Sequence, residues 1–595
     1  MPRAPVRHCS ANSIAAGREA EVENAGWSVV EGAADRSKNA GASLKPAATQ
    51  TDITWELERP EDRARWWIRD QLYTVVPRTP LSDSIFTPQW DEAVICIGDV
   101  LKFPDSRGFN ARTVNGYTFL SPMKITDPAV IEERLKQFVA NVQALSSTID
   151  DDLGRYHAEQ NAEMEYWRGV SLSTPNLMTL LEHWRRALGT MDRFWKLHFL
   201  IVFPRHVLAM MLDHAAHDAG ITDAQEIAKL TLSHGMTRQL QLDMELWQLA
   251  GRAIDLGLKG TFLGTAEEDL ENKLREAANG PVWLDEFARF LEEFGARTVI
   301  PDELSDRTWQ ENPVPVLGTL RAYIAQGGKY DFDRLARDTA AEREKTIKLA
   351  LAKIKDAAER EKFCDMLIRA RKFQQAMEDD NYYFLWSHAL VRKVALEIGR
   401  RLRAGGVLDS EEHVVFLYRG QMERALVDLA SGVYDLGPYA ALSRVQKSRW
   451  EGWCQLQPPS YIGDFPDEIE DVMVNHFWGI RGRRHLEQME GEISGLGASA
   501  GRVEGIARHV RGPQDFAKIE PGEIMICGST SPAWTPIFTK IAAVVTDQGG
   551  TLSHAAVVAR EYGLPAVLGT LHGTKRIRDG SRIRVDGTTG KVEIL

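Results

Sequence analysis

His554 is the side chain in this sequence that is best placed for chemistry. The apolar run 541–545 predicts a buried strand before it, and Gly550 belongs to the turn that follows this strand. Ser553 is a favourable N-cap and Gly563 a favourable C-cap, so a short helix is expected between them. His554 should therefore lie in the first turn of that helix.

The first turn of a helix gathers free backbone N–H groups and the positive end of the helix dipole, which favour an anion by roughly 0.3 to 1 kcal/mol. Neutral imidazole is also a competent nucleophile near neutral pH. We therefore interpret His554 as a phosphohistidine, with Gly550, Thr551 and Ser553 contacting the phosphoryl oxygens. A single histidine at a helix start is more often structural, so the surrounding pattern decides between the two interpretations.

That pattern is Gly549-Gly550-Thr551-Leu552-Ser553-His554-Ala555-Ala556, continued by Gly563-Leu564-Pro565-Ala566-Val567-Leu568-Gly569. It resembles the mobile phosphohistidine domain of phosphoenolpyruvate-utilising enzymes. The upstream segment 530–536 resembles the same domain, particularly its rifampin phosphotransferase type. The resemblance implies a swivelling β/β/α domain that carries phosphoryl groups on His554. Leu552 replaces the regulatory threonine of plant-type dikinases, so no such regulation is expected.

Length and composition limit the possible functions. A chain of 595 residues is too long for one core, and its net charge of -12 disfavours nucleic acid as a partner. No apolar run suggests a membrane partner. The five cysteines are scattered without metal-binding or disulfide spacing, which is typical of a cytoplasmic protein.

The chain divides into four parts on composition and periodicity. Residues 1–50 are expected to be a disordered tail. Residues 51–490 predict a large, mostly α-helical domain, because apolar residues recur at three-to-four spacing over long segments. The glycine-rich residues 491–501 predict a flexible hinge, followed by the small domain at 502–595. The predicted fold class is multidomain, with a helical acceptor domain and a C-terminal phosphohistidine domain.

The beginning of the helical region contains three local signals. Residues 55–70 show a helical pattern, and residues 77–88 are punctuated by proline and are expected to form a loop. Asn115-Gly116 predicts a tight hairpin turn between extended segments.

The helical region is similar in position to the acceptor domain of rifampin phosphotransferase. Gly295-Ala296-Arg297, the acidic pair Asp302-Glu303 and segment 307–313 are similar to the Gly-His-Arg, acidic and Arg-Trp-x-x-Asp-Pro pattern of that family. Ala296 replaces the usual histidine, which puts a proton-transfer role at this position in doubt.

A helical acceptor domain and a histidine domain without a nucleotide domain also resemble the larger subunit of phenylphosphate synthase. That resemblance implies a separate ATP-grasp subunit, which binds ATP and Mg²⁺ and gives the β-phosphoryl of ATP to His554, releasing AMP and phosphate. It also implies a small phenolic acceptor. No cofactor is then expected in this chain itself, and the tryptophan-rich helical region offers aromatic surface for a ring.

Transfer to a hydroxyl requires a base and cationic groups in the helical domain. The candidates between residues 371 and 392 are Arg371, Glu378, Asp379, His388 and Arg392, and Arg297 and Glu303 join them by resemblance. His388 and Arg392 should share one helix face. Ordinary ion pairs between helices are the alternative for each residue. His214 and Asp218 have a metal-compatible spacing, but no metal site is expected.

Three functions are compatible with these features. The first is a phosphotransferase subunit for a small aromatic hydroxyl compound. The second is a split antibiotic phosphotransferase of the rifampin type. The third is a non-catalytic phosphocarrier or regulatory protein. An enclosed pocket of phenol size favours the first, a broad cleft favours the second, and the absence of a pocket near the carrier favours the third.

Overall fold

A computed structural model describes residues 54–595 apart from 71–73, 232–235, 299, 301, 329–330, 434, 470–481, 484–492, 512, 531 and 551–552. The predicted tail at residues 1–50 lies outside the described residues.

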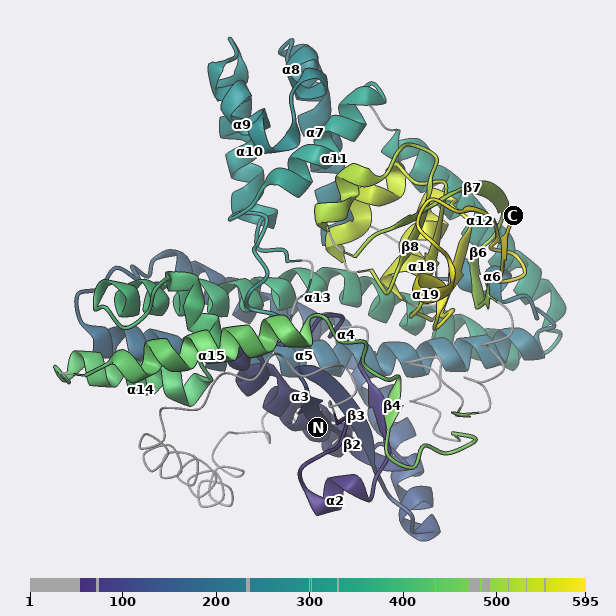
Figure 1. The fold of residues 1–595 in the computed structure, drawn as a ribbon. Coiled ribbons are helices and arrows are strands. Elements are labelled where there is room, and N and C mark those ends of the chain that lie inside the picture. The colour runs from purple at the N-terminus through teal and green to yellow at the C-terminus, as the bar shows by residue number, and fades with distance from the viewer. Residues whose placement is uncertain are drawn as a thin grey trace.

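The described part of residues 54–469 is mostly helical, which confirms the predicted fold class. Figure 1 shows long helices in layers beneath the yellow C-terminal domain. The helices are α2 (Pro60–Arg63), α3 (Pro80–Leu101), α4 (Pro128–Arg168), α5 (Leu177–Asp218), α6 (Ala224–Lys229), α7 (Arg238–Asp255), α8 (Lys259–Gly264), α9 (Glu267–Glu276), α10 (Gly280–Phe294), α11 (Val314–Ala325), α12 (Phe332–Lys353), α13 (Ala357–Ala404), η4 (Glu411–Phe416), α14 (Arg419–Ala430) and α15 (Gly437–Trp453).

Helices α5 and α13 form the centre of this domain. Contacts between them join Trp195 to His388, His198 to Asp380 and Arg205 to Gln374, so the two helices run antiparallel. Helix α5 is long and apolar enough to cross a membrane by length and composition, yet 61% of its most apolar window is buried in the protein. That burial is typical of a core helix.

A four-stranded antiparallel sheet interrupts the helical domain, with the order β2-β3-β1-β4. Its strands are β1 (Trp67–Arg69), β2 (Ser106–Val114), β3 (Tyr117–Lys124) and β4 (Tyr461–Ile462). The predicted turn at Asn115-Gly116 is confirmed, because both residues have positive φ and join β2 to β3.

Two local predictions in this region are wrong. Residues 55–70 contain the short helix α2 and strand β1, because Trp67 and Ile68 pair with β4 from far along the chain. Residues 77–88 include the start of α3 at Pro80, where the missing N–H of proline costs nothing.

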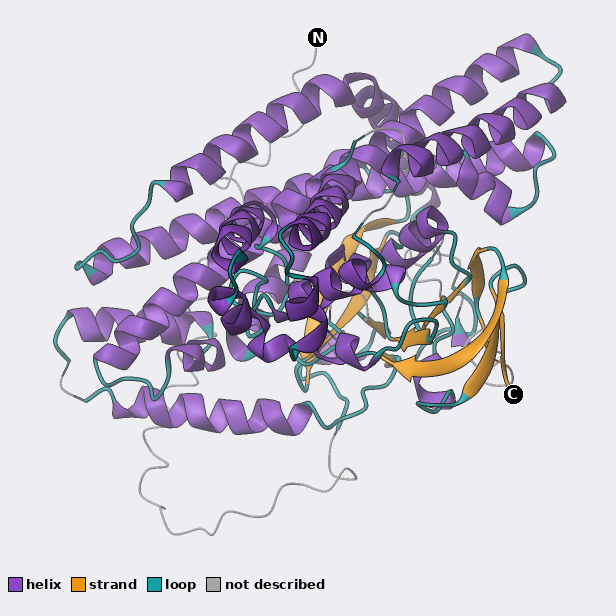
Figure 2. Ribbon diagram, turned by 90° about the horizontal axis from the view of Figure 1, so that it is seen from above, coloured by secondary structure: helices purple, strands orange, loops and turns teal. Residues whose placement is uncertain are grey.

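The C-terminal domain is built on an eight-stranded sheet of order β5-β12-β11-β7-β8-β9-β10-β6. Its elements are β5 (Ile493–Ser494), β6 (Leu496–Ser499), β7 (Arg502–His509), η5 (Pro513–Lys518), β8 (Ile524–Cys527), η6 (Pro532–Thr539), β9 (Ala543–Thr546), α18 (His554–Tyr562), β10 (Ala566–Leu568), α19 (Gly573–Arg576), β11 (Arg582–Asp586) and β12 (Lys591–Ile594). Figure 2 shows its strands as one group beside the helices.

Residues 493–499, predicted as part of a flexible hinge, instead form β5 and β6 of this sheet. The glycines in this segment serve close backbone packing. A Cβ atom on Gly495 would lie 2.3 Å from the Leu568 carbonyl oxygen, and one on Gly497 would lie 2.6 Å from that of Gly587. The glycine-rich composition of this segment therefore reflects close packing of the backbone.

The two domains share one hydrophobic cluster. Leu246, Trp309 and Tyr382 of the helical domain belong to the same buried cluster as Trp534 and Phe538 of the C-terminal domain. Helix α11 also contacts η5 and η6. The C-terminal domain is therefore docked on the helical domain through an apolar interface.

Candidate active site

The helix that carries His554 is built as its sequence predicts. Helix α18 begins at His554, and Ser553 caps it by accepting a hydrogen bond from the Ala556 N–H. It ends at Gly563, which has the left-handed conformation expected of a C-cap. His554 is thus the first helical residue, at the positive end of the helix dipole.

His554 contacts two residues of its own domain and is influenced by one charge of the helical domain. Its Nδ1 lies 3.0 Å from the Thr530 hydroxyl, and its ring packs edge-on against Phe538. The side chain is half-buried. Burial lowers the pKa of His554 from 6.5 to about 3, and the positive charge of Arg297 lowers it further in the same direction. The imidazole is therefore neutral at physiological pH and available as a nucleophile.

Arg297 is the group of the helical domain that acts electrostatically on His554. It follows α10 and is 3% exposed, with its guanidinium 5.9 Å from the Trp309 ring centroid. Its Nε and Nη1 atoms are buried and make no hydrogen bond to any described residue. Burial lowers the pKa of Arg297 to about 10, which still leaves it charged at pH 7. A buried cation with unused donors suits a phosphoryl group.

Two carboxyl groups interact with Arg297. Burial raises the pKa of Glu378, against the opposing effect of Arg205 and Arg297. Gln374 donates to Glu378 over 3.2 Å and accepts from Arg205 over 2.8 Å, which fixes the carboxyl group at the centre of α13. Burial raises the pKa of Asp243 to about 7, although Arg297 opposes the shift.

Asp243 also links the two domains. Tyr562, the last residue of α18, donates a hydrogen bond to the Asp243 carboxylate, which also accepts one from Gln239. Both ends of α18 therefore engage the helical domain, His554 through Arg297 and Tyr562 through Asp243.

His388 lies in a different environment from Glu378, although both belong to α13. It is 2% exposed and stacks on Phe86. Its Nδ1 lies 2.8 Å from the Phe384 carbonyl, and its Nε2 accepts from the Trp195 indole N–H over 3.0 Å. Both ring nitrogens are occupied within the core, so the structure does not place His388 beside His554.

The other predicted residues are also paired within the helical domain. Arg392 makes a bidentate ion pair with Glu311 at 2.8 and 2.9 Å. Glu303 accepts from the Thr79 N–H and hydroxyl, both at 2.8 Å. Arg371 donates to the Leu230 carbonyl at 2.9 Å. Of the predicted acceptor-side residues, Arg297 acts electrostatically on His554, and Glu378 interacts electrostatically with Arg297.

Of the three predicted phosphate contacts, the structure describes Gly550 and Ser553. Thr551 lies outside the described residues. Gly550 accepts a hydrogen bond from the Ser553 N–H, and the Ser553 hydroxyl caps α18. Thr530, which was not predicted as a phosphate contact, is the hydroxyl that lies against the imidazole.

The described residues contain no group of three or more His, Cys, Asp and Glu side chains arranged for a metal. His214 and Asp218 form an exposed pair 3.7 Å apart.

Sequence reasoning missed Asp243, Tyr562 and Arg205. Arg205 had a signal, because it is a charged residue inside the apolar stretch 197–212. Asp243 and Tyr562 had none, since each is an ordinary polar residue until the two domains meet.

Two family models match parts of this chain. Residues 519–590 match the mobile domain of PEP-utilising enzymes. Residues 198–378, which include Arg205, Asp243, Arg297 and Glu378, match the fourth domain of rifampicin phosphotransferase. Over these two segments the chain is similar to PEP-utilising enzymes and to rifampicin phosphotransferase.

Individual relatives agree with the family matches. An uncharacterized phosphotransferase, YvkC, of Bacillus subtilis is 32% identical over 67% of this chain and 47% of its own length. A rifampicin phosphotransferase of Streptomyces is 32% identical over 56% of this chain and 37% of its own. Chondramide synthase cmdD of Chondromyces crocatus is 29% identical over 92% of this chain and 14% of its own. The chain thus spans less than half the length of each relative.

Proposed function

We propose that this chain is a phosphotransferase in which His554 carries a phosphoryl group to the hydroxyl of a small-molecule acceptor. In the first half-reaction an imidazole nitrogen of His554 is phosphorylated with the β-phosphoryl of ATP, and ATP and water yield AMP and phosphate. In the second, the acceptor oxygen attacks phosphorus, the P–N bond breaks and the hydroxyl proton passes to a base.

The observation that carries this proposal is the buried guanidinium of Arg297, whose charge acts on His554 and whose Nε and Nη1 are unused by any described residue. Phosphoryl transfer needs little covalent help and depends on positioning and charge stabilisation. Arg297 supplies a cation on the acceptor side, and the start of α18 supplies the helix dipole on the carrier side.

Glu378 is the base in this proposal. Burial raises the pKa of Glu378, which makes its carboxylate a stronger base toward an approaching hydroxyl. Gln374 and Arg205 hold it in place. Ala296 cannot take the part of the histidine that occupies this position in the resembling family, so another base is required.

We assign the charging step to a separate ATP-grasp subunit that holds ATP and Mg²⁺, and the acceptor group to an aromatic hydroxyl. Both assignments follow the resemblance to the larger subunit of phenylphosphate synthase. A second candidate acceptor is a larger antibiotic-like ring compound, which is supported by the likeness to rifampicin phosphotransferases and by pockets of about 1240 and 930 Å³ in the helical domain.

Labelling tests this function. The full chain is incubated with an ATP-grasp protein and ATP labelled at the β-phosphate, and in parallel with labelled phosphoramidate, a chemical phosphoryl donor to histidine. We expect acid-labile, alkali-stable label on His554, absent from His554→Ala but present in His388→Ala if that variant folds. Label on another residue, or equal label in His554→Ala, would contradict the proposal.

A further inference from the structure

Trp309 is a buried tryptophan of the helical domain whose indole N–H has no acceptor among the described residues. The residue is 3% exposed, and its Nε1 atom makes no hydrogen bond to any of them. Four other buried tryptophans donate the indole N–H to a described acceptor over 2.8 to 3.0 Å, namely Trp67, Trp184, Trp195 and Trp283. Because a buried donor without a partner destabilises a protein, Trp309 requires an explanation that the other four do not.

Arg297 lies beside Trp309 and has the same property. The central carbon of its guanidinium is 5.9 Å from the Trp309 ring centroid. The Trp309 backbone N–H donates to the Arg297 carbonyl oxygen over 3.0 Å, and Gln310 donates to Gly295 over the same distance, so the two segments are held together. Two neighbouring side chains therefore present three buried donors that no described residue uses: Nε and Nη1 of Arg297 and Nε1 of Trp309.

Both side chains belong to the part of the helical domain on which the C-terminal domain is docked. Trp309 lies in the buried cluster that includes Phe538, and the His554 ring packs edge-on against Phe538. The charge of Arg297 acts on His554 itself.

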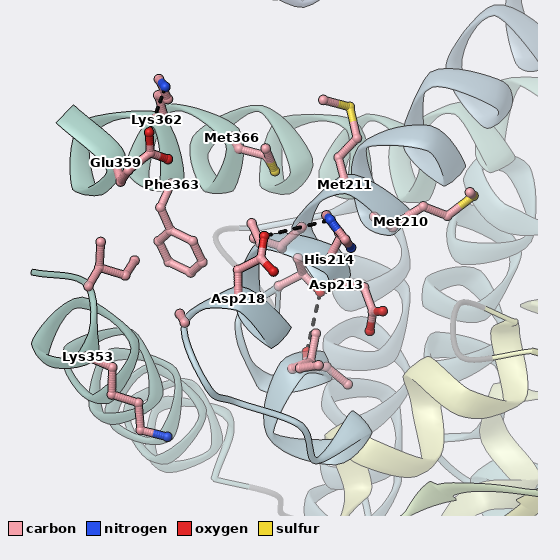
Figure 3. A pocket seen from close by; sticks show the side chains of 18 of the residues that line it. Met210, Met211, Asp213, His214, Asp218, Lys353, Glu359, Lys362, Phe363 and Met366 are labelled. Atoms are coloured by element: carbon pink, nitrogen blue, oxygen red, sulfur yellow. Dashed lines mark hydrogen bonds and ion pairs between the residues drawn. The ribbon is translucent and has the colours of Figure 1, made fainter. Parts of the chain in front are cut away.

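The pocket of about 1240 Å³ at the C-terminal end of α5 has a different character (Figure 3). Charged residues that line it pair with one another, since Asp218 lies 3.7 Å from His214 and Glu359 lies 2.8 Å from Lys362. All four side chains are exposed, so water also solvates them. Exposed pairs of this kind need no further partner, whereas buried unused donors do.

We propose that Arg297 and Trp309 form one binding site for the phosphoryl group carried on His554, in which the guanidinium and the indole N–H both donate to its oxygens. This inference rests on the proposed function and adds Trp309 to it. A phosphoryl group brings negative charge and three acceptor oxygens, which suit a cation and a further donor.

The site makes docking of the C-terminal domain depend on phosphorylation. When His554 carries a phosphoryl group, docking satisfies the buried donors of both residues. When the group has passed to the acceptor, the docked state leaves these donors without a partner. By linkage, the phosphorylated domain docks more tightly than the unphosphorylated one, so transfer itself favours release of the domain.

Hydrogen exchange at the docked interface tests this site. The full chain is charged with phosphoramidate, which gives its phosphoryl group to His554 and releases ammonia, and the intact mass gives the charged fraction. Exchange is followed in α11, which contacts η5 and η6 of the C-terminal domain. We expect charging to slow exchange on the order of 100-fold in the wild type, about tenfold for each of two charge-assisted hydrogen bonds, and to have no effect in His554→Ala.

Trp309→Phe keeps an aromatic ring and removes the indole N–H. We expect charging to slow exchange only about tenfold in this variant, because one of the two hydrogen bonds is lost. Trp184→Phe is the matched control, since Trp184 is buried and donates its indole N–H to Glu423 over 2.9 Å. Charging should slow exchange in Trp184→Phe as it does in the wild type. Urea denaturation of the uncharged chains should show the larger loss of stability in Trp184→Phe, because only Trp184 loses a hydrogen bond.

Two results would overturn this site. One is an equal effect of charging in Trp309→Phe and the wild type, and the other is exchange in α11 that charging leaves unchanged in the wild type. Failure of His554 to become charged would instead contradict the proposed function.

Discussion

Helix α13 carries two charged clusters that differ in one respect. Both ring nitrogens of His388 and the guanidinium of Arg392 have hydrogen-bond partners, namely Trp195, Phe384 and Glu311. Around Glu378, the neighbouring Arg297 keeps two buried nitrogens that no described residue uses, and it faces a second domain. The matched cluster holds the helices together, whereas the unmatched cluster is prepared for a group that arrives from outside.

Substitution of the two arginines gives the largest expected contrast in stability. Arg392→Met removes the guanidinium that pairs with Glu311 and donates to the Leu304 carbonyl, so we expect a loss on the order of 3 kcal/mol in the free energy of unfolding. Arg297→Met removes a buried charge with few hydrogen bonds, so its stability should equal or exceed that of the wild type. Urea denaturation measures both. A larger loss in Arg297→Met than in Arg392→Met would remove the distinction between the clusters.

The pH dependence of stability sharpens the same distinction. The pKa of His554 is lowered from 6.5 to about 3 in the folded protein, so the stability that its neutral form provides is lost as pH falls below 6.5 toward 3. We expect the free energy of unfolding of His554→Gln minus that of the wild type to increase by about 2 kcal/mol when the pH is lowered from 7.5 to 4.5.

The pKa of Asp243 shifts in the opposite direction, from 3.8 to about 7. Its contribution therefore lowers the free energy of unfolding as pH rises through that range. This contribution is common to wild type and His554→Gln and cancels in their difference. Urea titrations read by proteolysis at the two pH values measure that difference. A pH-independent difference would show that His554 titrates normally.

The hydrogen bond between Tyr562 and Asp243 gives the smallest expected effect. Tyr562→Phe should weaken docking of the C-terminal domain by about 1 kcal/mol, seen as faster hydrogen exchange at the apolar interface. Tyr439→Phe is the matched control, because its hydroxyl donates to Asp428 over 2.6 Å inside the helical domain. Equal exchange at the interface in both variants would argue against an interdomain role for Tyr562.

The parts that the sequence predicted well depend on local signals. Ser553 and Gly563 define α18 by capping, and Asn115-Gly116 defines a hairpin by backbone conformation, so both could be read from a few adjacent residues. The long helices of the 54–469 region were predicted by their apolar periodicity, which reports burial on one face.

The parts that could not be predicted depend on distant contacts. Strand β1 forms because Trp67 and Ile68 meet Ile462 and Tyr461, and local propensity alone favoured a helix there. A glycine-rich segment such as the one around Gly495 and Gly497 looks the same in the sequence whether it forms a flexible linker or a closely packed strand. The cluster of Arg297, Glu378 and Asp243 depends on the meeting of α7, α10 and α13, which no motif spacing reveals.

The most direct test is the single-turnover transfer of phosphoryl from charged His554 to a phenolic acceptor in wild type, Arg297→Met and Glu378→Gln. We expect all three chains to be charged to the same extent, and transfer to fall on the order of 100-fold or more in both variants, since one loses the cation and the other the base. Transfer at the wild-type rate in Arg297→Met would contradict the claim that the phosphoryl group passes from His554 to an acceptor beside Arg297.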